Sequence, residues 1–304
     1  MTSSREFHAA ATASTTAAQH PVAPVSLPAR KPRSARLGRD LVAAIVVGAA
    51  LGVVIIGSLL IAAQAFIVVL AAAAAVGTWE LVGALRRGAD IRVPPAVVLV
   101  GGQAMVWLSW PFGLSGLAAS FGATVLACML WRMRAGATHY LRDVSAALFT
   151  TAYVPLFVSF VTLLVVQPDG VGRVLTYMSC VVASDVGGYA AGVLAGRHPM
   201  APSISPKKSW EGFAGSQLAG MVAGALCVML LLDGRWWLGV LTGALLVVTA
   251  TLGDLVESLV KRDLGIKDMG TLLPGHGGLM DRLDSLLPAA AISWVLLSAF
   301  VPVG

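Results

Sequence analysis

The sequence predicts an all-α, polytopic integral membrane protein with about nine transmembrane helices, and three observations support this fold class. Only 12% of the 304 residues are charged, whereas soluble domains carry about 25%. The mean hydropathy is +0.83, and so apolar a chain cannot cover a water-exposed surface with polar side chains. The apolar residues also form runs of roughly 20, the length with which a helix spans a bilayer.

Residues 1–37 differ in composition from the rest of the chain. Ser, Thr, Ala and Pro dominate up to Pro28, and a basic segment follows. Such composition is typical of disorder, so we expect a disordered, basic cytoplasmic tail. A signal peptide is not expected, because the first apolar run begins at Leu41 and is too long for one. The tail either sets the topology or attracts anionic lipid headgroups.

After the tail, nine apolar stretches are long enough to be membrane spans. Their expected limits are 39–58, 60–84, 95–110, 113–132, 144–167, 171–195, 213–232, 236–261 and 283–303. We divide them into an N-terminal transmembrane region, 38–170, and a C-terminal catalytic region, 171–304, that carries the long cytoplasmic loops.

The basic residues predict the orientation of these spans, because Lys and Arg collect in cytoplasmic loops. With a cytoplasmic N-terminus and nine spans, all of the 21 Lys and Arg residues except Arg173 and Arg235 fall inside. The C-terminus is then outside. The cytoplasmic loops 196–212 and 262–282 are long and hold most residues capable of chemistry, so we expect a site facing the cytoplasm.

Four acids lie in or at the ends of predicted spans: Glu80, Asp185, Asp254 and Glu257. An unpaired carboxylate at membrane depth is costly, which makes each a candidate functional residue. Glu80 is the weakest, because a paired or snorkelling acid fits its position near a span end equally well.

Asp254, Ser258 and Lys261 follow i, i+4, i+7 spacing. This places a carboxylate, a hydroxyl and an ammonium group on one face of a helix that ends at the cytoplasmic surface. A polar helix end with a snorkelling lysine has the same pattern, so the spacing alone leaves both interpretations open.

The loop after this helix is rich in glycine and ends in two spaced acids. Glycines let backbone N–H groups approach phosphate oxygens. His276 among them is either a structural residue or, as we favour, one with a polar or phosphate-facing role. Asp281 and Asp284 share a face at the start of the last span, where carboxylates can hold Mg²⁺. Helix capping is the alternative, but it calls for one acid rather than two.

The earlier cytoplasmic loop carries Lys207 and Lys208 between serines, a pattern that suits a triphosphate or a lipid phosphate and also an ordinary basic loop. Upstream, Gly188, Gly192 and Gly196 recur every fourth residue, which is typical of close helix packing. We interpret these glycines as packing residues and the nearby Asp185 as functional.

These segments together resemble the phosphatidate cytidylyltransferase (CDP-diacylglycerol synthase) family. Its signature reads SLVKRDLGIKDMGTLLPGHGGLMDRLD at residues 258–284, and SDVGGYAAGVLAGR and SISPKKSWEGF upstream are also similar. The resemblance covers about residues 184–284; before residue 180 only the hydropathy is similar.

The resemblance implies that Asp254 and Asp281 bind a catalytic Mg²⁺, with Lys261 and Asp284 also catalytic. The substrate-binding set that we expect from these motifs is Asp185, Lys207, Lys208, Ser258, Arg262, Lys267, Asp268, His276, Gly277, Gly278 and Arg282.

The implied reaction converts CTP and phosphatidic acid to CDP-diacylglycerol and pyrophosphate at the cell membrane. The resemblance also implies K⁺ beside Mg²⁺ and a homodimer, and no nucleic-acid partner is expected. The nearest alternative is a CTP-dependent kinase of a polyprenol or phytol. A transporter is disfavoured, since its acids would lie near the bilayer midplane.

Overall fold

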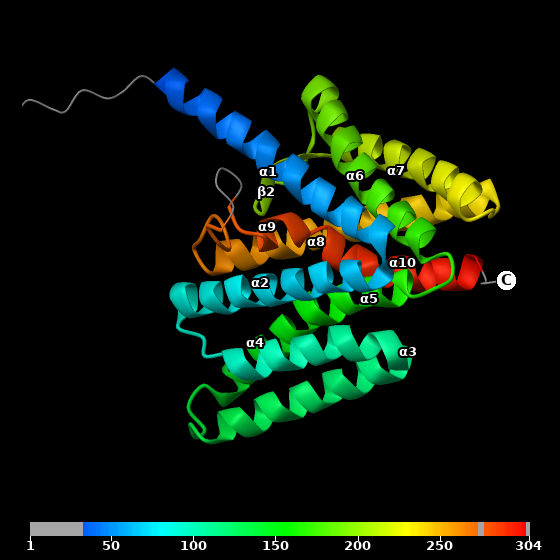
Figure 1. Ribbon diagram of the computed structural model, residues 1–304. Coiled ribbons are helices and arrows are strands. Elements are labelled where there is room, and N and C mark those ends of the chain that lie inside the picture. The colour runs from blue at the N-terminus through cyan, green and yellow to red at the C-terminus, as the bar shows by residue number, and fades with distance from the viewer. Residues whose placement is uncertain (1–32, 273–276, 302–304) are drawn as a thin grey trace, which may run out of the picture.

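The protein is a bundle of long helices, seen side by side in the computed structural model (Figure 1). The structure describes residues 33–272 and 277–301, with the side chains described from residue 46 onward. The elements are α1 (Arg33–Ile61), α2 (Ala63–Ala89), α3 (Pro95–Met133), α4 (Tyr140–Thr151), a π-helical turn (Ala152–Leu156), α5 (Phe157–Val165), α6 (Gly170–Ala195), β1 (Pro199–Ala201), β2 (Ser205–Ser209), α7 (Trp210–Leu231), α8 (Trp236–Asp263), α9 (Met280–Leu283) and α10 (Leu286–Phe300).

The helices are long and apolar enough to make this an all-helical polytopic membrane protein. In the described part of the chain, seven helical segments qualify as membrane spans by length and composition, and Val46–Ile61 is a shorter apolar helix. α4, the π-helical turn and α5 form one span, and α9 with α10 forms another. The expected count of nine and the sides on which the termini lie remain predictions.

One of the seven segments, α3, contains the two predicted spans 95–110 and 113–132. Gly113 interrupts it with φ 56° and ψ −140°, two residues after Pro111, and a positive φ of this kind favours glycine. The two halves then run back along each other (Figure 1), so closely that a side chain on Gly101 would collide with Thr124. α3 is therefore a helical hairpin.

The predicted tail ends earlier than expected. Residues 1–32 lie outside the described residues, but residues 33–37, which we assigned to the disordered tail, begin α1.

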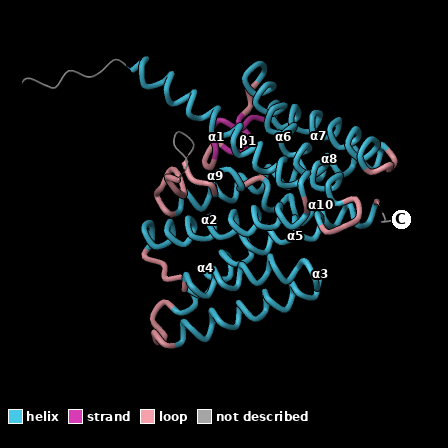
Figure 2. Tube along the Cα trace, viewed as in Figure 1, coloured by secondary structure: helices cyan, strands magenta, loops and turns pink. Residues whose placement is uncertain are grey.

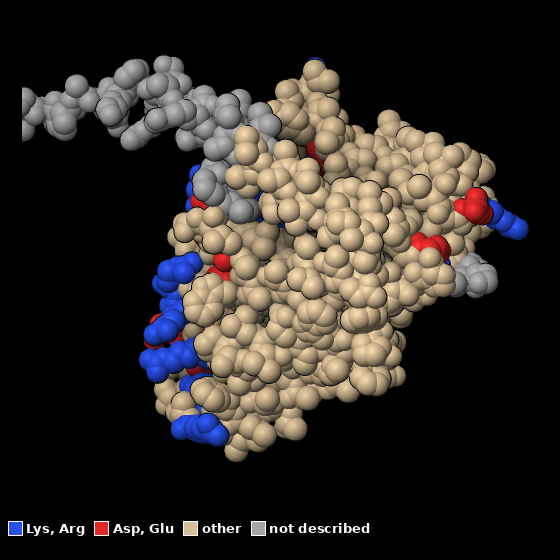
Figure 3. Space-filling model, viewed as in Figure 1, with Lys and Arg blue, Asp and Glu red and all other residues tan. Residues whose placement is uncertain are grey.

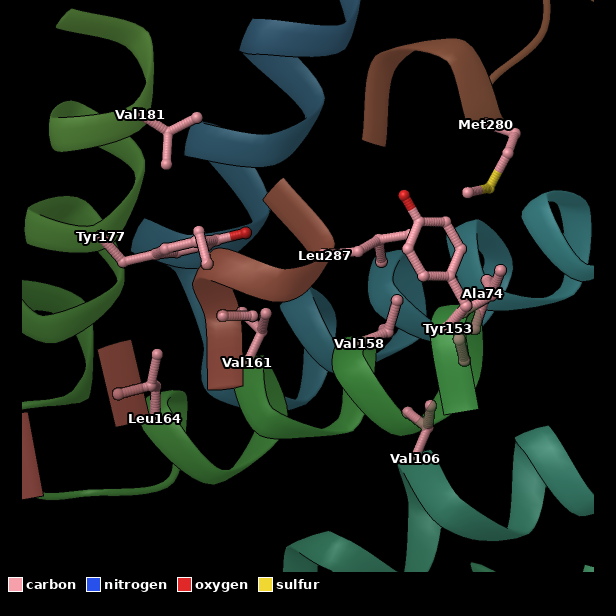
Figure 4. Close-up of a cluster of buried hydrophobic side chains, with 14 of the residues drawn as sticks. Ala74, Val106, Tyr153, Val158, Val161, Leu164, Tyr177, Val181, Met280 and Leu287 are labelled. Atoms are coloured by element: carbon pink, nitrogen blue, oxygen red, sulfur yellow. The ribbon is translucent and has the colours of Figure 1, made fainter. Parts of the chain in front are cut away.

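The buried core lies between the N-terminal and C-terminal helices. Tyr153 and Tyr177 point into it among apolar side chains such as Val158 and Leu287 (Figure 4). Their hydroxyl groups donate to backbone oxygens, Tyr153 to Gly253 at 3.1 Å and Tyr177 to Leu286 at 2.8 Å. Buried hydroxyls need such partners, and here they fix α8 and α10, the helices that carry the candidate site.

Helices α6 and α7 approach closely along small residues. A Cβ on Gly192 would lie 3.8 Å from Gly212 Cα, and one on Gly188 would collide with Ser216. The prediction that Gly188 and Gly192 serve helix packing is therefore confirmed. β1 and β2 pair antiparallel in the connection between these helices (Figure 2).

Charged side chains gather at the ends of the bundle. Figure 3 shows Lys and Arg concentrated at one end, where the α2–α3, α3–α4 and α8–α9 connections lie. A small mixed group occupies the opposite end, and the face between them is almost uncharged. This segregation is what a bilayer-spanning protein requires.

Candidate active site

A polar cavity of about 410 Å³ opens among α6, β2, α7, α8 and the start of the last span. Its volume falls within the usual range of small-molecule sites. Seven of the predicted site residues line it: Asp185, Lys207, Lys208, Asp254, Asp281, Arg282 and Asp284. Residues from four separate segments of the sequence are thus brought together.

Helix α8 presents the expected polar column. Ser258 Oγ donates to Asp254 Oδ1 at 3.3 Å. One turn further, Lys261 Nζ lies 2.9 Å from Glu257 Oε2 and 3.0 Å from Asp281 Oδ1. The i, i+4, i+7 spacing therefore has the structural consequence that it predicts, and Lys261 links α8 to the start of α9.

Asp281 is held by both charge and backbone hydrogen bonds. Besides Lys261, its carboxylate accepts from Met269 N at 3.1 and 3.2 Å and from Gly278 N at 2.8 Å. The bond from Gly278 comes from the backbone three residues before Asp281, next to the start of α9. Asp281 also lines the cavity, and its role as a Mg²⁺ ligand remains a prediction.

Lys208 forms the ion pair that connects the β-hairpin to α8. Its Nζ lies 2.5 Å from Asp254 Oδ2. The hairpin is tied to the first turn of α7 by Glu211, which accepts from Arg197 N and His198 N at 3.1 and 3.2 Å. Ser209 Oγ caps the same helix by accepting from Gly212 N at 3.1 Å, so the lysine-bearing strand has a fixed place beside the cavity.

The remaining acids concentrate negative charge at one wall. Asp185, Asp254 and Asp284 line the same cavity, and Glu257 lies buried on the same helix as Asp254. Carboxylates this close repel each other unless a cation or a proton compensates them. The lysines neutralise part of the negative charge of these carboxylates. The negative charge that remains makes this wall suited to a bound cation.

Several predicted residues lie elsewhere. Lys267 and Asp268 are exposed and do not line the cavity, and Arg262 donates instead to Ile204 O at 3.5 Å. His276 lies outside the described residues. Gly277 has φ 84°, and a Cβ there would lie 3.1 Å from Asp281 Oδ2, so its contact is with that carboxylate.

Three residues that the predicted site omits support it. Glu257 is fully buried against Lys261, and its place one turn before that lysine at membrane depth was the available signal. Glu80 and Arg87 on α2 hydrogen-bond to the glycine loop. No local pattern shows this, because the contacts span 200 and 182 residues.

The chain is a helical membrane protein with a cavity lined by lysine and aspartate side chains, a lining that suits a class of proteins acting on phosphorylated substrates at a bilayer. The model of the cytidylyltransferase family matches residues 42–300. The chain therefore belongs to the cytidylyltransferase family.

Curated relatives share most of this length. A phosphatidate cytidylyltransferase of Mycobacterium bovis (strain ATCC BAA-935 / AF2122/97) is 51% identical over 278 residues, which cover 87% of this chain and 90% of that protein. A phosphatidate cytidylyltransferase of Mycobacterium leprae (strain TN) is 51% identical over 279 residues, 86% of this chain and 89% of the relative. One from Brucella suis biovar 1 (strain 1330) is 38% identical over 135 residues, covering 44% and 50%.

Proposed function

We propose that this protein transfers the cytidylyl group of CTP to phosphatidic acid, which yields CDP-diacylglycerol and pyrophosphate for phospholipid biosynthesis. The observation that carries the proposal is the convergence of Lys207, Lys208, Asp254, Asp281 and Asp284 on one cavity, in a chain 51% identical to phosphatidate cytidylyltransferases. The surrounding apolar helices suit a lipid substrate, and the polar cavity suits a nucleotide.

The reaction makes few chemical demands on the protein. An oxygen of the lipid phosphate forms a bond to the α-phosphorus of CTP, and the bond from that phosphorus to the oxygen bridging to the β-phosphate breaks. The nucleophile is already an anion, so no general base is required. The protein must instead align two anionic substrates and offset their repulsion.

Basic side chains of the cavity supply part of that compensation. Lys207 and Lys208 on β2 and Arg282 on α9 line it, and we assign them to the phosphate groups. Lys208 already neutralises Asp254 at 2.5 Å, so an arriving phosphate would compete with that carboxylate for the lysine. Lys261 keeps Asp281 in place through its 3.0 Å ion pair.

The acids fit a divalent cation of the Mg²⁺ type. In the described part of the chain, no three His, Cys, Asp or Glu side chains converge as a complete metal site, but Mg²⁺ commonly takes one or two carboxylates together with water and substrate phosphates. Asp254 and Asp281 would hold it, with Asp284 beside them. A bound Mg²⁺ would polarise the reacting phosphate and stabilise the leaving pyrophosphate.

We place the protein in the cell membrane with this cavity facing the cytoplasm. Residues of β2 and α9 line the cavity, and these elements lie toward the same end of the bundle as the α8–α9 connection (Figure 1). The bias of Lys and Arg toward cytoplasmic loops supports this orientation. CTP would then enter from the cytoplasm and phosphatidic acid from the adjoining leaflet. K⁺ and a homodimer, which the family resemblance implies, remain predictions.

The test is reconstitution of the reaction. Purified protein in detergent is incubated with CTP, phosphatidic acid and Mg²⁺, and the liponucleotide and pyrophosphate are both quantified. Equal amounts of the two products are expected. A phosphorylated lipid alcohol and CDP as products, with polyprenol or phytol supplied, would instead support the lipid-kinase alternative.

A further inference from the structure

Helix α2 holds both ends of a segment that is remote from it in sequence. Arg87 Nη2 donates to the carbonyl oxygen of Met269 at 3.0 Å. About two turns earlier, Glu80 Oε2 accepts from Met280 N at 2.8 Å. The first contact fixes the loop where it leaves α8, and the second fixes the start of the last span.

The loop glycines fit around the Glu80 carboxylate. A side chain at Gly270 would collide with Glu80 Oε1, and a Cβ at Gly278 would lie 2.6 Å from Oε2. From the sequence alone, such glycines suggest close approach to phosphate. In the structure, Gly270 and Gly278 instead allow the loop backbone to approach an acid of the protein itself.

The residues that α2 holds are the same ones that hold Asp281. The carbonyl oxygen of Met269 accepts from Arg87, and its N–H donates to Asp281. Gly278, packed on Glu80, donates its N–H to Asp281 Oδ2. Any displacement of the loop from α2 would therefore displace the donors that orient this carboxylate.

If Glu80 only accepted the Met280 N–H to stabilise the fold, its buried carboxylate would be energetically unfavourable. Glu80 is 7% exposed, and its Oε1 has no hydrogen-bond partner in the described part of the chain. Burying a carboxylate in this way opposes folding, whereas a neutral Ser, Thr or Asn could accept the same N–H.

We propose that Glu80 and Arg87 are positioning residues for the reaction, which set the location of Asp281 through the backbone at residues 269–270 and 278–280. The expected change in kcat rests on the proposed function. The expected change in the position of the loop backbone does not. The N-terminal helices thereby take part in the active site without contributing a side chain to the cavity.

The test compares four variants in detergent. Glu80→Ala removes the acceptor, and Glu80→Gln retains an amide oxygen at the same place. Arg87→Gln removes the bond to Met269 O from an exposed position, where misfolding is not expected. Arg86→Gln is the matched control, since Arg86 is a neighbouring exposed arginine that does not line the cavity.

Two quantities are measured on each folded variant. Hydrogen exchange is followed in peptides covering residues 264–283, and kcat and KM are determined for both substrates. We expect Glu80→Ala and Arg87→Gln to lose exchange protection in these peptides. We also expect kcat to fall about 10- to 100-fold, as small misplacements of catalytic groups do, with KM for CTP changed less than about threefold. Glu80→Gln should retain most of the exchange protection and most of kcat. Arg86→Gln should match the wild-type protein in both.

Wild-type kcat in Glu80→Ala and Arg87→Gln, or unchanged exchange protection of the loop, would overturn the proposal. A loss confined to the yield of folded protein, with normal kcat per folded molecule, would also overturn it, because that is the result of a structural role alone. If the wild-type protein fails to transfer cytidylyl groups, the proposed function fails, while the exchange measurement still decides whether α2 positions the loop.

Discussion

The ammonium group of Lys261 lies 3.0 Å from Asp281 Oδ1, and this ion pair joins the end of α8 to the start of α9. The same ammonium group lies 2.9 Å from Glu257 Oε2. Lys261 thus neutralises two carboxylates, of which Glu257 is fully buried and Asp281 nearly so. Removing one partner of such a group leaves uncompensated buried charge.

Replacement of this lysine should damage stability and activity together. We expect Lys261→Met to lower the free energy of unfolding by about 3 kcal/mol and to abolish CDP-diacylglycerol formation. Thermal unfolding in detergent and product formation by the folded fraction measure the two effects. A variant with the wild-type melting temperature would show that the ion pairs contribute little.

The double variant Lys261→Met/Glu257→Gln separates the two effects. Neutralising Glu257 removes the buried charge, so part of the lost stability should return. Activity should not return, because Asp281 still lacks the ammonium group of Lys261. Recovery of activity along with stability would mean that Lys261 serves the fold alone.

Asp281→Asn should abolish CDP-diacylglycerol formation while the protein still inserts into membranes. The amide removes the negative charge proposed for Mg²⁺ binding and offers only one acceptor to Met269 N, Gly278 N and Lys261. Membrane fractionation and turnover in detergent test this, with Asp263→Asn, an exposed acid at the end of α8, as the control. Wild-type turnover would remove Asp281 from the proposed metal site.

Lys208 and Lys207 should contribute unequally. Lys208 is partly buried against Asp254, whereas Lys207 is exposed. We expect Lys208→Met to raise KM for CTP by about tenfold or more, since a hydrogen bond to a charged group contributes about 1.5–3 kcal/mol, and Lys207→Met to raise it less. Initial rates over a range of CTP concentrations give both values. The reverse order would contradict the assigned phosphate contact.

Chelation should stop the reaction reversibly. Asp185, Asp254 and Asp284 line the same cavity, and negative charge gathered in one place favours a cation there. We expect EDTA to abolish turnover and added Mg²⁺ to restore it, measured by product formation after each addition. Full activity in EDTA would exclude the metal-assisted mechanism.

Hydropathy predicted the helices well, because a bilayer forces each span to be a long apolar run. It also separated the two halves of α3, since the gap between their predicted limits begins at Pro111 and the second predicted span begins at Gly113, where the helix reverses. The α8 column followed from helical spacing alone. Each of these features depends on residues that are close in sequence.

The contacts of α2 with the glycine loop could not be predicted, because they join residues that are far apart in sequence. Glu80 meets Met280 across 200 residues, and one sequence contains no local pattern for such a contact. The β-hairpin that carries Lys207 and Lys208 was likewise expected only as a loop. Its strands are short, and its position depends on Glu211 and Ser209 at the start of the next helix.

The most direct measurement of the central claim is the position of the phosphate transferred from CTP. Purified protein is supplied with phosphatidic acid, Mg²⁺ and CTP labelled in either the α- or the γ-phosphate, and the lipid fraction is extracted. Label from the α-phosphate should enter the lipid, and label from the γ-phosphate should leave as pyrophosphate. Entry of the γ-label into lipid, without the α-label, would contradict cytidylyl transfer.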